Sequence, residues 1–245
     1  MKQWITGRNP VYECLRANRR HFFRLLVAED VQRSGHINEI FSLAEARKLN
    51  IEWKERRELL SLSEHNQGIA LQVSSYPYAE LTDVFSLAKK KNESFFLLLL
   101  AQIQDPQNFG TLIRSAELFG VHGIFIPLSR SAGVTPAVVN ASSGACEHLL
   151  IVQTNIVQAI SQIKQRGGWV IGLDVDDNLT TIEQVKLNGN IAIVVGGEGA
   201  GLRRLVYRQC DYIARIPTRG RLDSLNAAVA GSIALYAAYL QRNNQ

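Results

Sequence analysis

Hydrophobic positions in the first 75 residues follow two different periods. One set recurs near every 3.6 residues, which predicts an amphipathic helix over residues 37–49: Ile37, Ile40, Phe41, Leu43, Ala44 and Leu49. A second set, Ile69, Leu71 and Val73, alternates as a half-buried strand does. The pattern also favours a helix over residues 9–19 and a strand over residues 24–28. We therefore predict a small domain of alternating helices and strands over residues 1–75.

The rest of the chain begins with a turn-rich stretch, residues 74–78 with Pro77. We expect a linker over residues 76–94, with a bridging helix at 82–91. Five short and continuously apolar runs follow, at residues 95–103, 121–126, 169–173, 191–195 and 212–216. Such runs, each followed by a helical pattern, are typical of a parallel sheet covered on both faces. We predict a doubly wound α/β domain over residues 95–245.

Composition supports a folded globular chain. Of 245 residues, 46% are hydrophobic and 20% are charged, which excludes global disorder and a fibrous repeat. The longest apolar run is far shorter than the ~20 residues of a membrane helix, and the N-terminus lacks the apolar core of a signal peptide. We expect a cytoplasmic protein. Its three cysteines form no C-x-x-C pair, so neither a disulfide framework nor a metal site is predicted.

The net charge of +5 suits a polyanionic partner but is also common in proteins without one. The densest basic stretch contains Arg16, Arg19, Arg20, His21 and Arg24.

The first segment that suggests chemistry is DPQNFGTLIRSAELFG, residues 105–120. Asn108 stands near a helix start, where it either caps the helix or takes part in a site. Arg114 lies in the first turns of a largely apolar helix, where an arginine normally needs an anionic partner. A surface salt bridge is the alternative for Arg114.

The second segment is IAIVVGGEGAGLRRLV, residues 191–206. Its glycines allow a sharp turn and bring backbone N–H groups close to a ligand. The lysine and hydroxyl of a P-loop are missing, and Leu202 replaces the third glycine of a dinucleotide fingerprint. Glu198 is either part of a site or merely solvated.

The third segment is IPTRGRLDSLNAAVAGSIALY, residues 216–236. Asp223 or Ser224 is expected to cap a helix that has almost no polar face, so that helix should be buried or close to another helix. Elsewhere, five scattered histidines form no hydrolase triad, and Cys146-Glu147-His148 lacks further metal ligands.

The three segments, in this order, resemble the signature motifs of the SpoU (TrmH) family of RNA ribose methyltransferases. The motifs are N-x-x-x-x-x-R at Asn108 and Arg114, G-E-G-x-G at Gly197 to Gly201, and S-L-N at Ser224 to Asn226. The N-terminal ITGRNPVYECL resembles, more weakly, the start of an L30e-like RNA-binding domain. The nearest likeness is to bacterial 23S rRNA guanosine 2′-O-methyltransferases.

The resemblance implies a trefoil-knotted (SPOUT) catalytic domain, S-adenosylmethionine as cofactor, and a homodimer whose sites use groups from both subunits. The implied cofactor-binding residues are Gly196, Gly197, Ile216, Leu225 and Leu173, although relatives often have threonine in place of Leu173. The implied catalytic residues are Arg114, Asn108, Glu198, Ser224 and Asn226. No metal is required.

Physical chemistry limits the role of the central arginine. A guanidinium stays protonated in almost any site, so Arg114 is better suited to gripping a phosphate and stabilising a developing alkoxide than to acting as a base. We hypothesise that Arg16, Arg19, Arg20 and Arg24 contact RNA phosphates. Ribosomal RNA is favoured over tRNA because of the extra N-terminal domain. The alternatives are a tRNA methyltransferase, a non-catalytic RNA-binding or ribosome-assembly protein, and, least favoured, a nucleotide-cofactor oxidoreductase.

Overall fold

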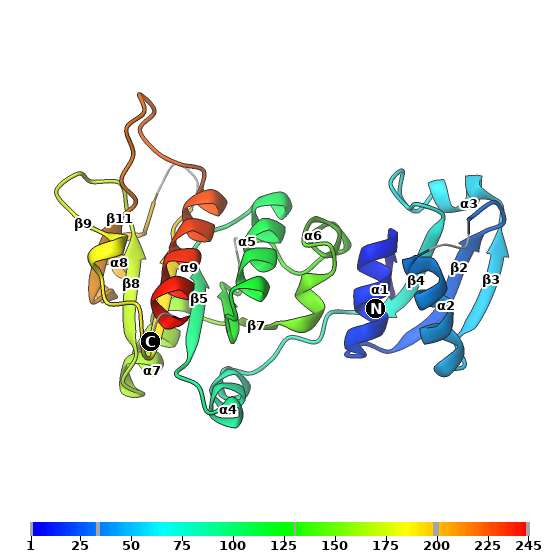
Figure 1. Ribbon diagram of the computed structural model, residues 1–245, viewed down its shortest axis with the longest axis horizontal. Coiled ribbons are helices and arrows are strands. Elements are labelled where there is room, and N and C mark those ends of the chain that lie inside the picture. Colours follow the sequence, from blue (N-terminus) through cyan, green and yellow to red (C-terminus); the bar gives the residue numbers. More distant parts are fainter. Residues whose placement is uncertain (1, 33–34, 130, 198–200, 244–245) are drawn as a thin grey trace. The chain divides into compact units, whose positions relative to one another are not determined.

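The computed structural model describes residues 2–32, 35–129, 131–197 and 201–243 (Figure 1). The chain divides into two compact units, which we call the N-terminal and C-terminal units. The N-terminal unit contains Met1–Pro77 and Val134–His148, and the C-terminal unit contains Tyr78–Gly133 and Leu149–Gln245. Residues 134–148, which we expected to belong to the second domain, therefore fold with the first.

The N-terminal unit is built on a four-stranded mixed sheet of order β1-β4-β2-β3. The strands are β1 (Lys2–Thr6), β2 (Phe22–Ala28), β3 (Asn50–Lys54) and β4 (Ile69–Ser74), and its helices are α1 (Arg8–Ala17), α2 (His36–Ala46), α3 (Arg56–Leu60) and α6 (Pro136–Ala141). Strand β4 is antiparallel to β1 and β2, while β2 and β3 are parallel. The predicted helices and strands are all present, and β1, β3, α3 and α6 were not predicted.

The C-terminal unit contains a seven-stranded sheet of order β7-β6-β5-β10-β8-β11-β9, in which every pairing is parallel. The strands are β5 (Phe96–Leu100), β6 (Gly123–Ile126), β7 (Leu150–Gln153), β8 (Trp169–Leu173), β9 (Thr180–Thr181), β10 (Ile191–Val195) and β11 (Tyr212–Arg215). The five predicted apolar runs correspond to β5, β6, β8, β10 and β11. The parallel α/β prediction is confirmed.

Helices cover both faces of this sheet. They are α4 (Leu81–Lys91), α5 (Pro106–Leu118), α7 (Ile156–Gln165), α8 (Arg204–Gln209) and α9 (Ala227–Asn243), with a 3-10 turn at Ile182–Gln184. Buried side chains of α4, α7 and α8 pack with Leu97, Leu99 and Val194 on one face. Helices α5 and α9 lie against each other on the opposite face, where α9 packs on β10.

The contact between α5 and α9 depends on a glycine. A Cβ added at Gly231 would lie 2.5 Å from Leu112 Cδ2 and 3.0 Å from Val195 Cγ2. The hydroxyl oxygens of Ser115 and Ser232 lie 2.8 Å apart across the same contact. The expectation that small residues bring the C-terminal helix close to another helix is confirmed.

The described helices include none that combines the length and apolar character needed to cross a bilayer. Cys14 and Cys146 are buried, Cys210 is partly buried, and all three are free thiols.

Candidate functional site

A cavity of about 470 Å³ opens at the carboxyl ends of three neighbouring strands, β10, β8 and β11. This position is where ligands bind in open parallel sheets, and the volume lies within the usual range for small-molecule sites. The lining residues are Leu173, Asp174, Val175, Asp177, Val195, Gly196, Gly197, Gly201, Arg215, Ile216, Thr218, Asp223, Ser224, Leu225, Asn226, Ala227 and Ala230.

Glycine is required where the chain leaves β10. A Cβ at Gly196 would lie 2.4 Å from the carbonyl carbon of Gly201 and 2.8 Å from the backbone nitrogen of Leu202. Gly197 and Gly201 are joined by two backbone hydrogen bonds, of 3.1 and 3.2 Å. Gly201 has a φ of +58°, which side-chain-bearing residues rarely adopt. The glycines therefore allow two backbone segments to close one wall of the cavity.

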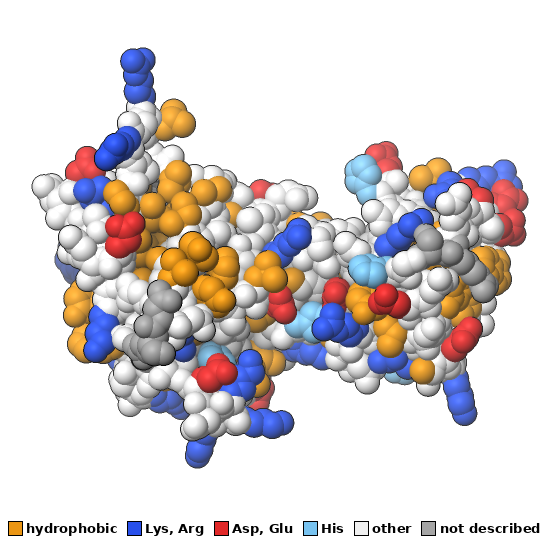
Figure 2. Space-filling model, viewed as in Figure 1, with side chains coloured by type: hydrophobic (Ala, Val, Ile, Leu, Met, Phe, Trp, Pro, Cys, Tyr) orange, Lys and Arg blue, Asp and Glu red, His pale blue; other side chains and the backbone are white. Residues whose placement is uncertain are grey.

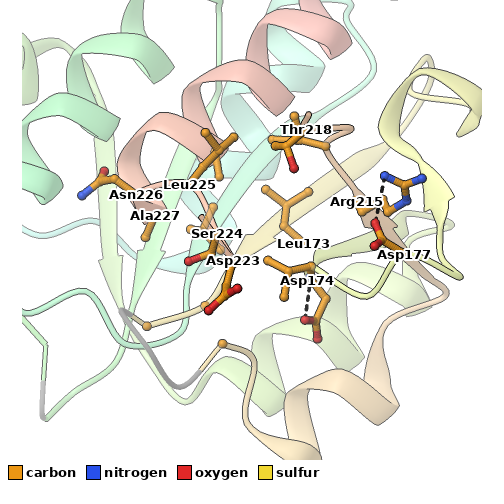
Figure 3. Close-up of a pocket in the computed structure, with 17 residues that line it drawn as sticks. Leu173, Asp174, Asp177, Arg215, Thr218, Asp223, Ser224, Leu225, Asn226 and Ala227 are labelled. Atoms are coloured by element: carbon orange, nitrogen blue, oxygen red, sulfur yellow. Dashed lines mark hydrogen bonds and ion pairs between the residues drawn. The ribbon is translucent and has the colours of Figure 1, made fainter. Parts of the chain in front are cut away.

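The cavity combines apolar side chains with carboxylates. Leu173, Leu225 and Thr218 converge on it in Figure 3. Asp174, Asp177 and Asp223 contribute three carboxyl groups to the lining, and Asp177 Oδ1 lies 3.5 Å from Arg215 Nη1. Among the described lining residues the acidic groups outnumber the single guanidinium. The cavity therefore suits a ligand that is partly apolar and carries positive charge.

The structure brings most of the predicted site together. All five predicted cofactor-binding residues line the cavity, and so do Ser224 and Asn226. Glu198 lies outside the described residues. Asp174, Asp177, Arg215 and Thr218 also line the cavity and were not predicted, although each lies within a predicted strand or at most four residues after one.

Asn108 and Asn226 connect the first and third motifs. The Asn226 Nδ2 group donates to Asn108 Oδ1 at 3.1 Å, and Asn226 Oδ1 accepts the N–H groups of Ala228 and Val229. Asn226 is therefore the cap of α9, and the prediction that Asp223 or Ser224 caps that helix is wrong. Asp105 caps α5 by accepting from the N–H groups of Gln107 and Asn108. The Asn108 side chain is thus not the cap, and its Oδ1 accepts from Asn226 instead.

Arg114 is exposed on α5 and is not among the residues that line the cavity. In the described part of the chain no carboxylate pairs with it, so the anionic partner that its position suggests is not supplied by these residues. Gln107, Thr111 and Leu118 share its exposed face of the helix.

An apolar surface lies on the neighbouring helix α9. Val229, Ile233, Tyr236 and Leu240, spaced as one helical face, are each 38–48% exposed. Leu118 of α5 is 65% exposed, and Phe119 contacts the ring of Tyr236. Figure 2 shows hydrophobic side chains gathered over this part of the C-terminal unit. We call these residues of α5 and α9 the α5/α9 face.

Most of the predicted RNA-binding arginines are engaged inside the N-terminal unit. Arg20 and Glu147 form a completely buried ion pair at 2.6 Å, so the prediction that Arg20 binds RNA phosphate is wrong. Arg19 donates to Tyr76 and to two backbone carbonyls. Arg24 pairs with Glu52 at 3.3 Å. Arg16, with its side chain 60% exposed, remains largely accessible and lies 3.4 Å from Glu13.

Two family models match the chain. The SpoU rRNA methylase family model matches residues 96–236. A model described as RNA 2′-O ribose methyltransferase substrate binding matches residues 4–79. Together they cover both units, and the first covers more than half of the chain.

Curated relatives match over nearly the full length. A protein of Bacillus subtilis named "Putative TrmH family tRNA/rRNA methyltransferase YacO" is 36% identical over 98% of this chain and 96% of its own length. An "Uncharacterized tRNA/rRNA methyltransferase" of Mycolicibacterium vanbaalenii is 38% identical over 98% of this chain and 77% of its own length.

Solved structures share the fold. The SpoU methyltransferase AviRb of Streptomyces viridochromogenes, crystallised with AdoMet, superposes with a TM-score of 0.82 at 22% identity, covering 100% of this chain and 92% of that chain. A structure titled as an RNA 2′-O ribose methyltransferase gives 0.78 at 21% identity, covering 98% and 88%. The architecture of β-strands and helices described above is therefore that of SpoU methyltransferases.

Proposed function

Because this chain belongs to the SpoU family of RNA methyltransferases, we propose that it transfers a methyl group from S-adenosylmethionine to a ribose 2′-hydroxyl of RNA. The proposed target is a guanosine of large-subunit ribosomal RNA. The observation that carries the proposal is the cavity in which Gly196, Ile216 and Leu225 meet beside the linked pair Asn108 and Asn226.

The residues of the cavity fit the proposed cofactor. S-adenosylmethionine, when bound, supplies a methyl group on a positively charged sulfonium. Leu173, Ile216 and Leu225 offer an apolar wall for the adenosyl part. Asp174, Asp177 and Asp223 give the lining an acidic balance that favours cationic groups. The backbone at Gly196 and Gly197 allows close approach.

In this proposal the protein positions the ribose and handles its proton. The exposed guanidinium of Arg114 binds the phosphate next to the target ribose and stabilises the developing alkoxide, while the hydroxyl proton leaves through an oxygen of that phosphate. Asn226 is held in place by its hydrogen bond to Asn108 and orients the target ribose at the edge of the cavity. A permanently charged Arg114 is suited to this electrostatic role and not to that of the base.

We further propose that the α5/α9 face binds a second copy of the chain. A twofold contact uses the same surface on both copies, and an apolar helical face of this kind is suited to it. Arg114 lies on the same helix as Leu118, so the contact would carry Arg114 of one copy toward the cavity of its partner. This arrangement accounts for an arginine that is exposed in one copy and still needed for transfer.

The predicted trefoil knot remains part of the proposal. Its support is the membership of the SpoU family. The end of α9 is also tied to the segment between β9 and β10. Gln241 accepts from the N–H of Leu187 and donates to the carbonyl of Val185, and Arg242 donates to the carbonyl of Gly189.

Methyl mapping tests the proposed reaction. Unmodified large-subunit rRNA and unmodified tRNA, both transcribed in vitro, would be incubated with the protein and a CD₃-labelled cofactor, then digested to nucleosides for mass spectrometry. We expect labelled 2′-O-methylguanosine from the rRNA alone. Label on a base would exclude ribose chemistry, label on tRNA would exclude rRNA specificity, and no label on either RNA would favour the non-catalytic alternative.

A further inference from the structure

The segment between β11 and α9 carries two arginines beside the mouth of the cavity. Thr218 and Asp223 line the cavity, and Arg219 and Arg221 lie between them in sequence. We call residues 218–223 the 218–223 loop. It projects from the C-terminal unit in Figure 1, and Figure 2 shows basic side chains at its tip.

Within the described part of the chain, neither arginine has a binding partner. Both are exposed, and neither has an ion pair or hydrogen bond to another described residue. The contrast with Arg215 is informative, because Arg215 stands at the base of the same segment and pairs with Asp177 and the carbonyl of Leu179. Leu222, between Arg221 and Asp223, is 84% exposed. The loop therefore holds two unneutralised guanidinium groups and an apolar side chain in solvent.

Chain geometry keeps these groups close to the cavity. Consecutive Cα atoms lie ~3.8 Å apart, so Arg219 begins one residue from the lining residue Thr218 and Arg221 two residues from Asp223. Asp174, Asp177 and Asp223 are among the residues that line the cavity, and Asp177 pairs with Arg215, whereas Arg219 and Arg221 are not in the lining. The lining thus has an acidic balance, and the loop beside it is basic.

We infer that the 218–223 loop grips the RNA backbone next to the target nucleotide, with Arg219 and Arg221 each binding a phosphate. Guanidinium groups bind phosphate oxygens in a forked geometry, and such contacts fix the position of the strand without reading its sequence. An acidic interior admits the cationic cofactor while the basic edge holds the polyanionic substrate. This inference rests on the proposed function in taking RNA as the substrate and the cavity as the place of methyl transfer.

The test compares R219Q/R221Q with wild type in RNA binding and in turnover. Binding of a fluorescent polyuridine oligonucleotide, measured by anisotropy at several salt concentrations, should show a log K against log [salt] slope reduced by about 1.4, the value for two single-strand phosphate contacts. With in-vitro-transcribed rRNA, the KM should rise about tenfold while kcat at saturating RNA is retained, because phosphate contacts made before transfer mainly contribute uniform binding. Affinity for S-adenosylhomocysteine, measured by calorimetry, should not change.

Two control variants make the result specific. K90Q/K91Q removes the same charge from exposed residues at the end of α4, at the opposite edge of the sheet, and should keep the wild-type slope. Leu222→Ser changes the same loop without changing charge, and should also keep the slope. An unchanged slope in R219Q/R221Q, or an equal reduction in K90Q/K91Q or Leu222→Ser, would overturn the inference.

Failure of the proposed function would look different. If wild type binds polyuridine through the loop but places its methyl on a base, the ribose assignment fails and the loop assignment stands. If wild type methylates ribose and R219Q/R221Q has the wild-type KM and slope, only the loop assignment fails.

Discussion

The cavity wall can close at Gly196 because this residue has no Cβ atom. The Cβ of any other residue would meet backbone atoms of Gly201 and Leu202 within 2.8 Å, and backbone cannot move aside as a flexible side chain can. We expect Gly196→Ala to separate the two segments and to weaken S-adenosylhomocysteine binding at least tenfold, or about 1.4 kcal/mol. Isothermal calorimetry measures this loss, and thermal unfolding checks that the variant is folded.

Gly220→Ala is the matched control for that substitution. Gly220 does not line the cavity, and the nearest atom to its added Cβ is 3.9 Å away, an ordinary contact. Gly220→Ala should bind S-adenosylhomocysteine with the same affinity as wild type. Wild-type affinity in folded Gly196→Ala would contradict the role given to this glycine.

Residue-scale roles were only partly predictable from the sequence. The motif residues Gly196, Leu225 and Asn226 were identified by their neighbours in the sequence and meet in the cavity. The capping roles of Asp105 and Asn226 were not identified, because adjacent short polar residues are equally good caps until the backbone fixes which one is at the helix start. The burial of Arg20 depends on Glu147, more than 120 residues away, and no local pattern reveals such a pair.

The contact between helices α5 and α9 leaves no room for a side chain at Gly231. Because the Cβ position at Gly231 is already occupied by Leu112 and Val195, we expect Gly231→Val to reduce the free energy of unfolding by about 1–3 kcal/mol through overpacking. Urea denaturation at a fixed protein concentration measures the change. The control Ala237→Val, at a partly exposed position of the same helix, should cost well under about 1 kcal/mol.

A second substitution tests the cause. Leu112→Ala removes the side-chain carbon that lies 2.5 Å from the added Cβ, so the double variant Leu112→Ala/Gly231→Val should be more stable than the sum of the two single changes implies. If the changes in unfolding free energy of the two single variants simply added up, the destabilisation by Gly231→Val would have a cause other than the clash with Leu112.

Elements were predictable where burial is continuous. Strands β5, β6, β8 and β10 are buried almost throughout and read as unbroken apolar runs. Strand β11 was also predicted, although only Ala214 of its four residues is buried. Strand β1, KQWIT, and strand β3, NIEWK, lie at the edges of their sheet and mix polar with apolar residues, so neither period stands out. The two-residue strand β9 is too short for any pattern. Edge strands owe their existence to pairing with a neighbour, which the sequence alone does not display.

At the scale of the whole molecule, the chain order and the spatial order differ in two places. The connection between β6 and β7 contains residues 134–148, which pack with the N-terminal unit through the Arg20–Glu147 pair. In the sheet, β10 inserts between β5 and β8, so that the three motif-bearing segments meet although Gly197 lies 89 positions after Asn108 in the sequence. The order of motifs indicated the family, while their meeting depends on this strand order.

Assembly decides where Arg114 acts. If the α5/α9 face joins two copies and Arg114 serves the partner's cavity, a heterodimer of Arg114→Ala with Gly196→Ala has one intact site, formed by the cavity of the first chain and the arginine of the second. Purified through two different affinity tags and assayed at a cofactor concentration that does not saturate Gly196→Ala, this heterodimer should have about half of the wild-type activity, although each homodimer has little. Methyl transfer to in-vitro-transcribed rRNA measures the recovery, and a doubly tagged Arg114→Ala dimer controls for the procedure. An arginine that served its own chain's cavity would leave both sites of the heterodimer defective, so no activity beyond that of the homodimers would appear.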